Sequence, residues 1–204
     1  VNPRTNPNVL LVDDIDETTP LWSTNQNTPV PRKAKDMAAA VSLLLKVAYD
    51  IVFVDPHFAP TPRFLRPFEQ FMACCAQSRN SKPPRIRLIT KASLPILPGD
   101  PFEGNCQISL APVIPSTLNC ELIRVVEKRN PSEVLHNRFI LTDRGGVKFG
   151  IGLDDGEDGQ TDDVDLLSQE SFDLRWRQYA LMQAFDEPVP VATIAGTKAI
   201  AAQA

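Results

Sequence analysis

The chain has 204 residues, a net charge of −4 at pH 7 and 43% hydrophobic residues, which is enough apolar material for the core of one ordinary domain. The acidic balance excludes a global basic field of the kind that attracts nucleic acid or anionic membranes, although a local basic patch stays open. No apolar run reaches the length of a membrane span, so no transmembrane segment is predicted.

The four cysteines form neither a C-x-x-C pair nor a spacing with histidine that suits zinc. We therefore predict no disulfide, no metal and no cofactor, and we expect a reducing, cytoplasmic setting. The opening residues Val1-Asn2-Pro3 favour a fragment of a larger parent protein or assembly.

Helical and strand patterns alternate along the chain. A helix is predicted over 33–49, where apolar residues recur three or four positions apart, and an apolar strand over 50–58 follows it. The series continues with a helix over 61–78, strands over 85–90 and 120–128, a hairpin over 138–153 and a helix over 171–185. This order predicts a layered α/β/α domain whose central sheet is mixed.

Three segments are predicted on this basis. Residues 1–32 hold a short strand, Val9–Val12, and a polar connection, residues 33–187 form the α/β domain, and residues 188–204 form a C-terminal tail or linker. The proline-rich stretch over 93–115 is long enough for a functional loop or a lid.

The hairpin carries the chemistry that stands out most. Its first strand places His136 and Arg138 on one face, because side chains two apart on a strand point the same way, and Asp143 opens the turn. An imidazole can attack phosphorus or transfer a proton, a guanidinium can bind phosphoryl oxygens and a carboxylate can orient a ring. The set predicts a site that handles phosphate.

These residues resemble the signature of the phospholipase D superfamily, H-x-K-x4-D-x6-G-S-x-N. The chain keeps the spacing as His136-x-Arg138-x4-Asp143-x6-Gly150, but arginine replaces lysine, Ile151 replaces serine and leucine stands at the asparagine position. The tail Gly150-Ile151-Gly152-Leu153-Asp154 looks more like the C-terminal phospholipase D-like domain found after MIT domains, a branch in which catalysis is generally thought to be lost.

The resemblance implies a phospholipase D-like fold and specific roles. His136 would be the nucleophile that forms a phosphohistidine, and Asp143 would orient or support the motif. Arg138, Gly150 and Gly152 would bind the phosphate. The family's active site uses two motifs and this chain has one, so a second histidine must come from elsewhere, either from a homodimer partner or from His57.

His57 follows the apolar strand Ile51–Val54, whose carboxyl end is where ligands bind in open α/β sheets. Under one interpretation its ring is satisfied by nearby backbone at a proline turn. Under the other, His57 lies beside His136 and replaces the missing second motif.

Residues 154–173 contain nine acidic residues and no basic one. The spacing does not fit a calcium loop, so we predict a mobile acidic loop, with divalent-cation binding as the alternative. Such a loop beside a phosphate site would repel anionic substrates.

Three functions follow. The first is a metal-independent phosphodiesterase or nuclease of phospholipase D type, acting on nucleic acid or phospholipid. The second is a catalytically inactive module that binds a phosphorylated ligand or a protein partner. The third is a structural domain of a larger assembly. The sequence identifies neither the substrate nor the oligomeric state.

Overall fold

The computed structural model describes residues 28–78, 82–92, 101–126, 135–185 and 189–199. The predicted strand Val9–Val12 and most of the polar connection lie outside the described residues. No helix among these ranges has the length and apolar character that crossing a membrane requires.

The chain forms one mixed eight-stranded sheet and four α-helices within the described ranges. The strands lie in the order β1-β7-β6-β5-β2-β3-β4-β8. In chain order the elements are β1 (Thr28–Pro31), α1 (Ala34–Val47), β2 (Asp50–Val54), α2 (Pro62–Ala76), β3 (Arg85–Lys91), α3 (Phe102–Leu110), β4 (Asn119–Val125), β5 (Arg138–Thr142), β6 (Gly145–Phe149), β7 (Thr161–Leu166), α4 (Gln169–Arg175) and β8 (Val189–Ala195).

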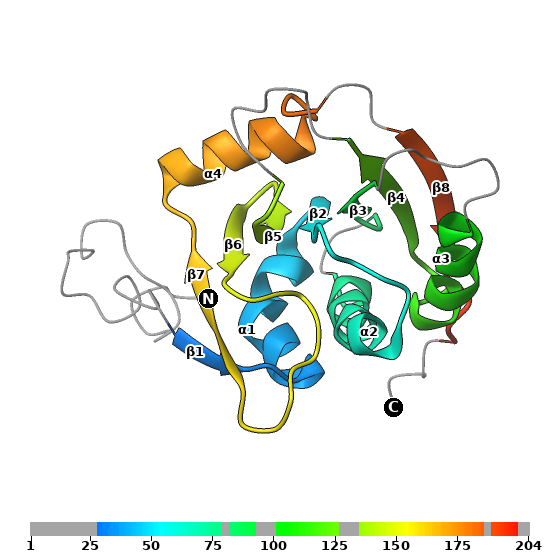
Figure 1. Ribbon diagram of the computed structural model, residues 1–204, viewed down its shortest axis with the longest axis horizontal. Helices are drawn as coiled ribbons and strands as arrows, with labels where there is room; N and C mark the ends of the chain where they lie inside the picture. Colours follow the sequence, from blue (N-terminus) through cyan, green and yellow to red (C-terminus); the bar gives the residue numbers. More distant parts are fainter. Residues whose placement is uncertain (1–27, 79–81, 93–100, 127–134, 186–188, 200–204) are drawn as a thin grey trace, which may run out of the picture.

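The centre of the sheet is parallel and its flanks are antiparallel. Strands β2, β3 and β4 run parallel and are joined through α2 and α3, because parallel neighbours need a crossover connection. Strand β5 pairs antiparallel with β2, and the hairpin β5–β6 continues to β7 and β1. Figure 1 shows α1, α2 and α3 on one face of the sheet and α4 on the other. The predicted α/β class and the mixed sheet are thus confirmed.

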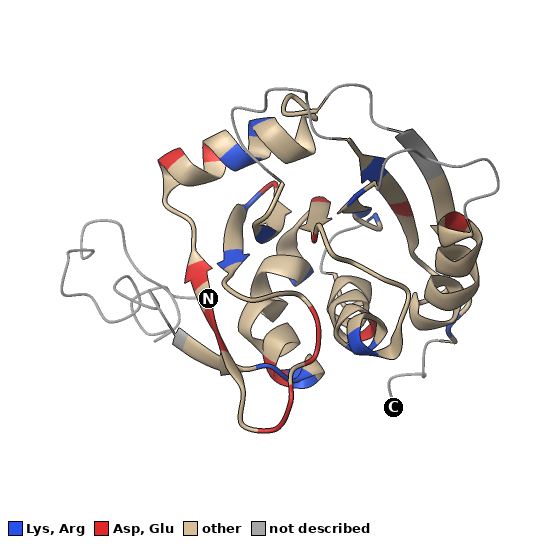
Figure 2. Cartoon of the chain, viewed as in Figure 1, with Lys and Arg blue, Asp and Glu red and all other residues tan. Residues whose placement is uncertain are grey.

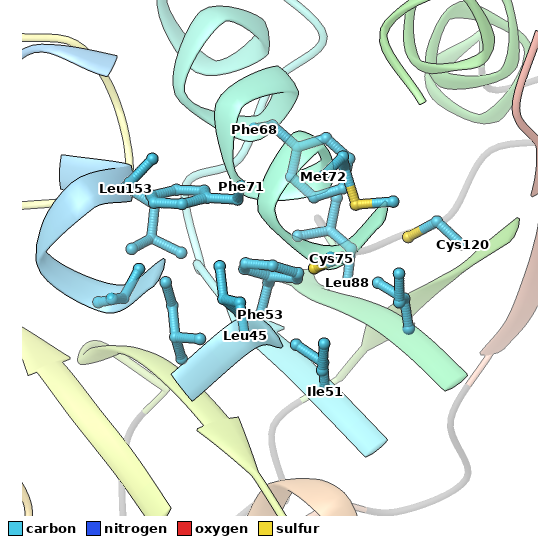
Figure 3. Close-up of a cluster of buried hydrophobic side chains, with 14 of the residues drawn as sticks. Leu45, Ile51, Phe53, Phe68, Phe71, Met72, Cys75, Leu88, Cys120 and Leu153 are labelled. Carbon is cyan, nitrogen blue, oxygen red and sulfur yellow. The ribbon is translucent and has the colours of Figure 1, made fainter. Parts of the chain in front are cut away.

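Strand β2 is buried on both faces, which explains why its sequence is continuously apolar. Ile51 and Phe53 join the core beneath α1 and α2, whereas Val52 and Val54 join the core beneath α4. The larger core is rich in phenylalanine, and Figure 3 shows Phe53 among the side chains of α2. The Phe53 ring lies 5.4 Å from that of Phe68 and 5.7 Å from that of Phe71, centroid to centroid.

These aromatic contacts hold α2 against β2. Each buried phenylalanine stabilises the fold by roughly 2–3 kcal/mol, so α2 is held in one position against β2. The two ends of the short connection between them are therefore also held in place. His57 lies in that connection.

The sheet extends beyond the predicted boundaries of the α/β domain. β1 pairs with β7 at one edge, within the predicted N-terminal connection, and β8 pairs with β4 at the other edge, within the predicted C-terminal tail or linker. Both segments are rich in proline or small residues, and edge strands tolerate these because one side of their backbone needs no partner. The predicted boundaries at 33 and 187 are therefore too narrow.

Two internal predictions also need correction. Helix α3 occupies part of the stretch that was predicted to be a loop or lid. The last helix begins at Gln169, with the Ser168 side chain accepting a hydrogen bond from the Ser171 amide, so Ser168 is the cap. After α4 the backbone continues as a π-helical segment over Trp176–Ala180.

Candidate functional site

Two strand ends bring the histidines together. Continued by one residue past its last pair, the antiparallel register of β2 and β5 places Asp55 opposite Arg138, and continued by three it places His57 opposite His136. The two imidazole rings lie edge to face, with their centroids 6.3 Å apart. Both side chains are exposed. The structure therefore brings His57 and His136 side by side at the carboxyl end of β2.

Asp55 lies beneath this pair and is almost fully buried. One carboxylate oxygen accepts a hydrogen bond of 2.9 Å from the His57 amide, and the other accepts one of 3.2 Å from the Leu153 amide. A single side chain thus joins the end of β2 to the loop that follows β6. Asp55 is a site residue that the sequence does not single out, since its only local signal is its position between an apolar strand and a proline turn.

Burial raises the pKa of the Asp55 carboxyl above its usual value. The two amide hydrogen bonds and the positive charge of Arg138 act in the opposite direction, and the nearby Asp154 adds to the increase. The apolar surroundings explain why burial dominates. Asp55 lines a small cavity, sized for about one water molecule, whose other walls are Phe58, Phe64, Phe68, Phe71, Leu88 and Leu153.

Arg138 is the first residue of β5 and supplies the positive charge where the end of β2 meets the start of β5. Strand alternation puts it on the same face as Ile140, which faces the core beneath α1 and α2. Its Nε is buried and has no hydrogen-bond partner within the described ranges. Arg32 and Arg87, which form structural ion pairs, share such an unpartnered Nε, so the position of Arg138 at the strand end that carries the two histidines is what favours an anionic ligand.

Asp143 lies at the other end of β5. Its carboxylate accepts hydrogen bonds from the amides of Tyr49 (2.7 Å) and Asp50 (3.2 Å) and pairs with Arg144. These contacts fasten the turn of the hairpin to the start of β2. The structure thus does not bring Asp143 to the histidines, because a five-residue strand separates the two ends of the motif.

The amides of Gly150 and Gly152, predicted to bind phosphate, are already occupied. Gly150 donates to the backbone carbonyl of Asp163, and Gly152 donates to the carboxylate of Asp162 at 3.3 Å. The amide of Ile151 donates to the same carboxylate at 2.9 Å. The loop donors therefore serve β7 inside the fold, and the prediction that the two glycines bind phosphate is not supported by this arrangement.

The acidic segment is clamped by arginines rather than free. Asp154 pairs with the buried Arg32 at 2.7 Å and with Arg63, and Asp155 pairs with Arg66. Figure 2 shows the acidic loop after β6 beside the basic residues that precede α1. The prediction of a mobile acidic loop over 154–173 is wrong, since its first part is ion-paired and later parts form β7 and α4.

Metal ligands do not gather in the described ranges, where no group of three or more His, Cys, Asp or Glu side chains is placed to hold an ion. The chemistry available at the end of β2 is that of two imidazoles, one guanidinium and one buried carboxylate. Such a set can bind an anion, transfer protons and provide a nitrogen nucleophile.

No protein family matches the chain, and no curated protein matches it. Among solved structures, the chain is similar to TrmBL2, described as an archaeal chromatin protein with a novel mode of DNA binding, at 12% sequence identity and a TM-score of 0.36. The similarity covers 77% of this chain and 52% of that one, so this chain spans about half the length of TrmBL2. A TM-score this low establishes neither a shared family nor a shared function.

Proposed function

We propose that this chain is a phosphodiesterase with a phospholipase D-like layered fold, which cleaves its substrate through a phosphohistidine on His136. The observation that carries the proposal is the meeting of the only two histidines of the chain, which come from segments 79 positions apart, at one strand end beside Arg138.

The distance between the rings suits one phosphoryl group. Attack needs about 3 Å between the nucleophilic nitrogen and phosphorus, and a proton donor lies about 3 Å from the leaving oxygen. Ring nitrogens on opposite sides of one phosphoryl group are therefore roughly 7 Å apart once the bond between phosphorus and oxygen is included. The ring nitrogens lie on the rims of the two rings, so the centroid separation of 6.3 Å is compatible with a nitrogen separation of this size.

The reaction divides into two steps at this site. In the first, a ring nitrogen of His136 attacks phosphorus, the bond from phosphorus to the leaving oxygen breaks, and His57 gives that oxygen a proton. In the second, His57 takes a proton from water, whose oxygen attacks phosphorus and breaks the bond between nitrogen and phosphorus. Arg138 stabilises the negative charge that collects on the phosphoryl oxygens.

The charges around the site are compatible with an anionic substrate. The carboxylates that would repel it, Asp154 and Asp155, are paired with Arg32, Arg63 and Arg66. Their field is therefore largely cancelled by arginines that lie before α1 and in α2. Because these carboxylates are ion-paired, they repel a phosphate much less than free carboxylates would.

The test is hydrolysis of bis(p-nitrophenyl) phosphate and of single-stranded DNA in EDTA. We expect turnover by the wild type, none above background for His136→Ala and a strong reduction for His57→Ala. Arg144→Ala is the matched control, because it removes a cation from the far end of the same hairpin. Absence of turnover by folded wild-type protein on both substrates would reject this function.

A second function is favoured by the loop that follows β6. In this chain Ile151 and Leu153 stand where the related signature has serine and asparagine, and the amides of that loop are engaged by Asp162 and Asp55. The loop thus adds no side-chain donor for a transition state, whereas Arg138 can still bind phosphate, often through two hydrogen bonds. This combination supports an inactive module that binds a phosphorylated ligand.

Measurements of ligand affinity and turnover distinguish the binding module from the enzyme. If the chain is a binding module, affinity for phosphorylated ligands survives His136→Ala and is lost in Arg138→Ala, and turnover is absent in the wild type. If it is an enzyme, both substitutions reduce turnover.

A further inference from the structure

We propose that Asp55 is the positioning residue of this site, holding His57 at the distance from His136 that lets both rings act on one phosphoryl group. The inference rests on the proposed function for its catalytic consequence. Its geometric part, that Asp55 sets the separation of the two rings, stands on the contacts alone.

Asp55 is a junction between three segments. Its amide donates to the Ile89 carbonyl at 3.0 Å, which continues the pairing of β2 with β3 beyond the end of the strand. Its carbonyl accepts from the Phe58 amide at 3.2 Å, which closes the turn that carries His57. With the two carboxylate contacts to His57 and Leu153, every polar group of Asp55 is used.

The carboxylate does what an amide cannot do. Both of its oxygens accept hydrogen bonds from backbone amides, whereas an asparagine side chain has only one acceptor atom and would turn its NH₂ group toward the other donor. Burying a carboxyl among phenylalanines is costly, so packing alone does not account for an acid at this position. The contacts account for it, because one oxygen fixes the His57 turn and the other fixes the loop after β6.

Asparagine and apolar substitutions at Asp55 therefore test the hydrogen bonds to His57 and to Leu153 separately. Asp55→Asn retains an acceptor for the amide two positions on, a turn that asparagine favours, and gives up the contact to Leu153. Asp55→Ala removes both contacts. Asp55→Leu also removes both but fills the space next to Phe58 and Leu88 with an apolar side chain, so it provides a folded variant if the alanine variant does not fold.

The first readout is the dependence on the leaving group. p-Nitrophenolate leaves without a proton, whereas phenolate depends on an acid, so a displaced His57 slows diphenyl phosphate more than bis(p-nitrophenyl) phosphate. Because His57 is also the base of the second step, the comparison uses the rate of leaving-group release in the first turnover. We expect Asp55→Ala or Asp55→Leu to reduce that rate about 100-fold for diphenyl phosphate, as a misplacement of about 1 Å does, and less than about 10-fold for bis(p-nitrophenyl) phosphate. Asp55→Asn should lose only a few-fold on both.

The second readout does not need activity. Because the chain has only two histidines, their ring protons can be assigned from His57→Ala and His136→Ala spectra. The edge-to-face contact predicts an NOE between the rings in the wild type. We expect that NOE to persist in Asp55→Asn and to disappear in folded Asp55→Ala or Asp55→Leu.

Two results would overturn the inference. One is an unchanged NOE between the rings in a folded variant that lacks both contacts. The other is an equal loss of the first-turnover rate on the two substrates, which is what a general loss of stability produces. If the wild type turns over neither substrate, the proposed function fails, and the NOE series alone decides whether Asp55 positions His57.

Discussion

Each end of the β2–β5 strand pair has an arginine and an aspartate, but the side chains are satisfied within the protein at one end and partly unsatisfied at the other. At one end Asp143, Arg144 and Tyr49 satisfy one another: the carboxylate takes two backbone amides, and the guanidinium lies 5.4 Å from the centre of the Tyr49 ring. At the other end the histidines are exposed, and a buried nitrogen of Arg138 has no partner in the described ranges. The two exposed histidines beside a guanidinium are what distinguish this end of the strand pair from the structural cluster at the other end.

Residues that belong to one sequence motif are not always close in the folded structure. His136 and Asp143 belong to one motif, yet they lie at opposite ends of β5, whereas His57 lies outside the motif and meets His136. Spacing along a strand fixes a face and a distance. It does not bring the first and last residues of a motif, here His136 and Asp143, into one site.

After the complete loss expected for His136→Ala, the largest effect should come from outside the motif. We predict that His57→Ala lowers the rate of diphenyl phosphate hydrolysis by at least about 100-fold, the usual contribution of a positioned acid. Asp143→Ala, inside the motif, should lower it less than about 3-fold, since its amide donors can turn to water. Steady-state kinetics on both purified variants measures the difference, and equal losses would place Asp143 in the chemistry.

Stability should also distinguish the two acids. Asp55→Ala leaves two donors without acceptors, one of them buried at Leu153, and should lower the free energy of unfolding by about 2–3 kcal/mol. Asp143→Ala exposes its donors to solvent and should cost about 1 kcal/mol or less. Urea unfolding followed by circular dichroism gives both values, and a smaller loss at Asp55 than at Asp143 would argue against the junction described above.

Anion binding compares the two arginines. Arg138→Ala should weaken the binding of inorganic phosphate by about 10-fold or more, because a charge-assisted hydrogen bond contributes about 1.5–3 kcal/mol. Arg144→Ala should change it less than about 2-fold, since a single exposed charge contributes little. Isothermal titration at low ionic strength measures the affinities, and the idea fails if the two variants lose affinity equally.

Much of the fold is visible in the sequence, and the exceptions have physical causes. The helix over 34–47 and the strand at 50–54 follow from periodicity and burial. Strand β7 was missed because its acids suggested a solvated loop, whereas Asp162 is buried and accepts the amides of the preceding loop. Strand β8 was missed because proline and alanine resemble a linker.

The site was predictable in part. His136 and Arg138 follow from the motif, and His57 from its place after an apolar strand. The pairing of β2 with β5 joins segments about 90 residues apart, and local patterns do not specify that register. Without the register, the opposition of Asp55 to Arg138 cannot be derived. The arginine clamp on Asp154 depends on other long-range contacts, since Arg32 follows β1 and Arg63 lies in α2.

The smallest predicted effect is a dependence of stability on pH. Because the pKa of Asp55 is raised in the folded state, the folded protein holds its proton more tightly than the unfolded chain. The stabilisation is complete below the ordinary value of 3.8 and is lost as pH rises through the folded-state pKa. The difference in unfolding free energy between wild type and Asp55→Asn should therefore shrink as pH rises from about 4. A difference that grows over this range would contradict the assignment.

The most direct test is to trap the covalent intermediate. In His57→Ala, bis(p-nitrophenyl) phosphate can still react with His136, because p-nitrophenolate leaves without a proton, but the hydrolysis of the adduct lacks its base. Alkaline quenching and peptide mass spectrometry should find a p-nitrophenyl phosphoryl group on His136 in that variant and none in His136→Ala. Turnover by the wild type without any adduct on His136 would contradict the proposed role of this histidine pair.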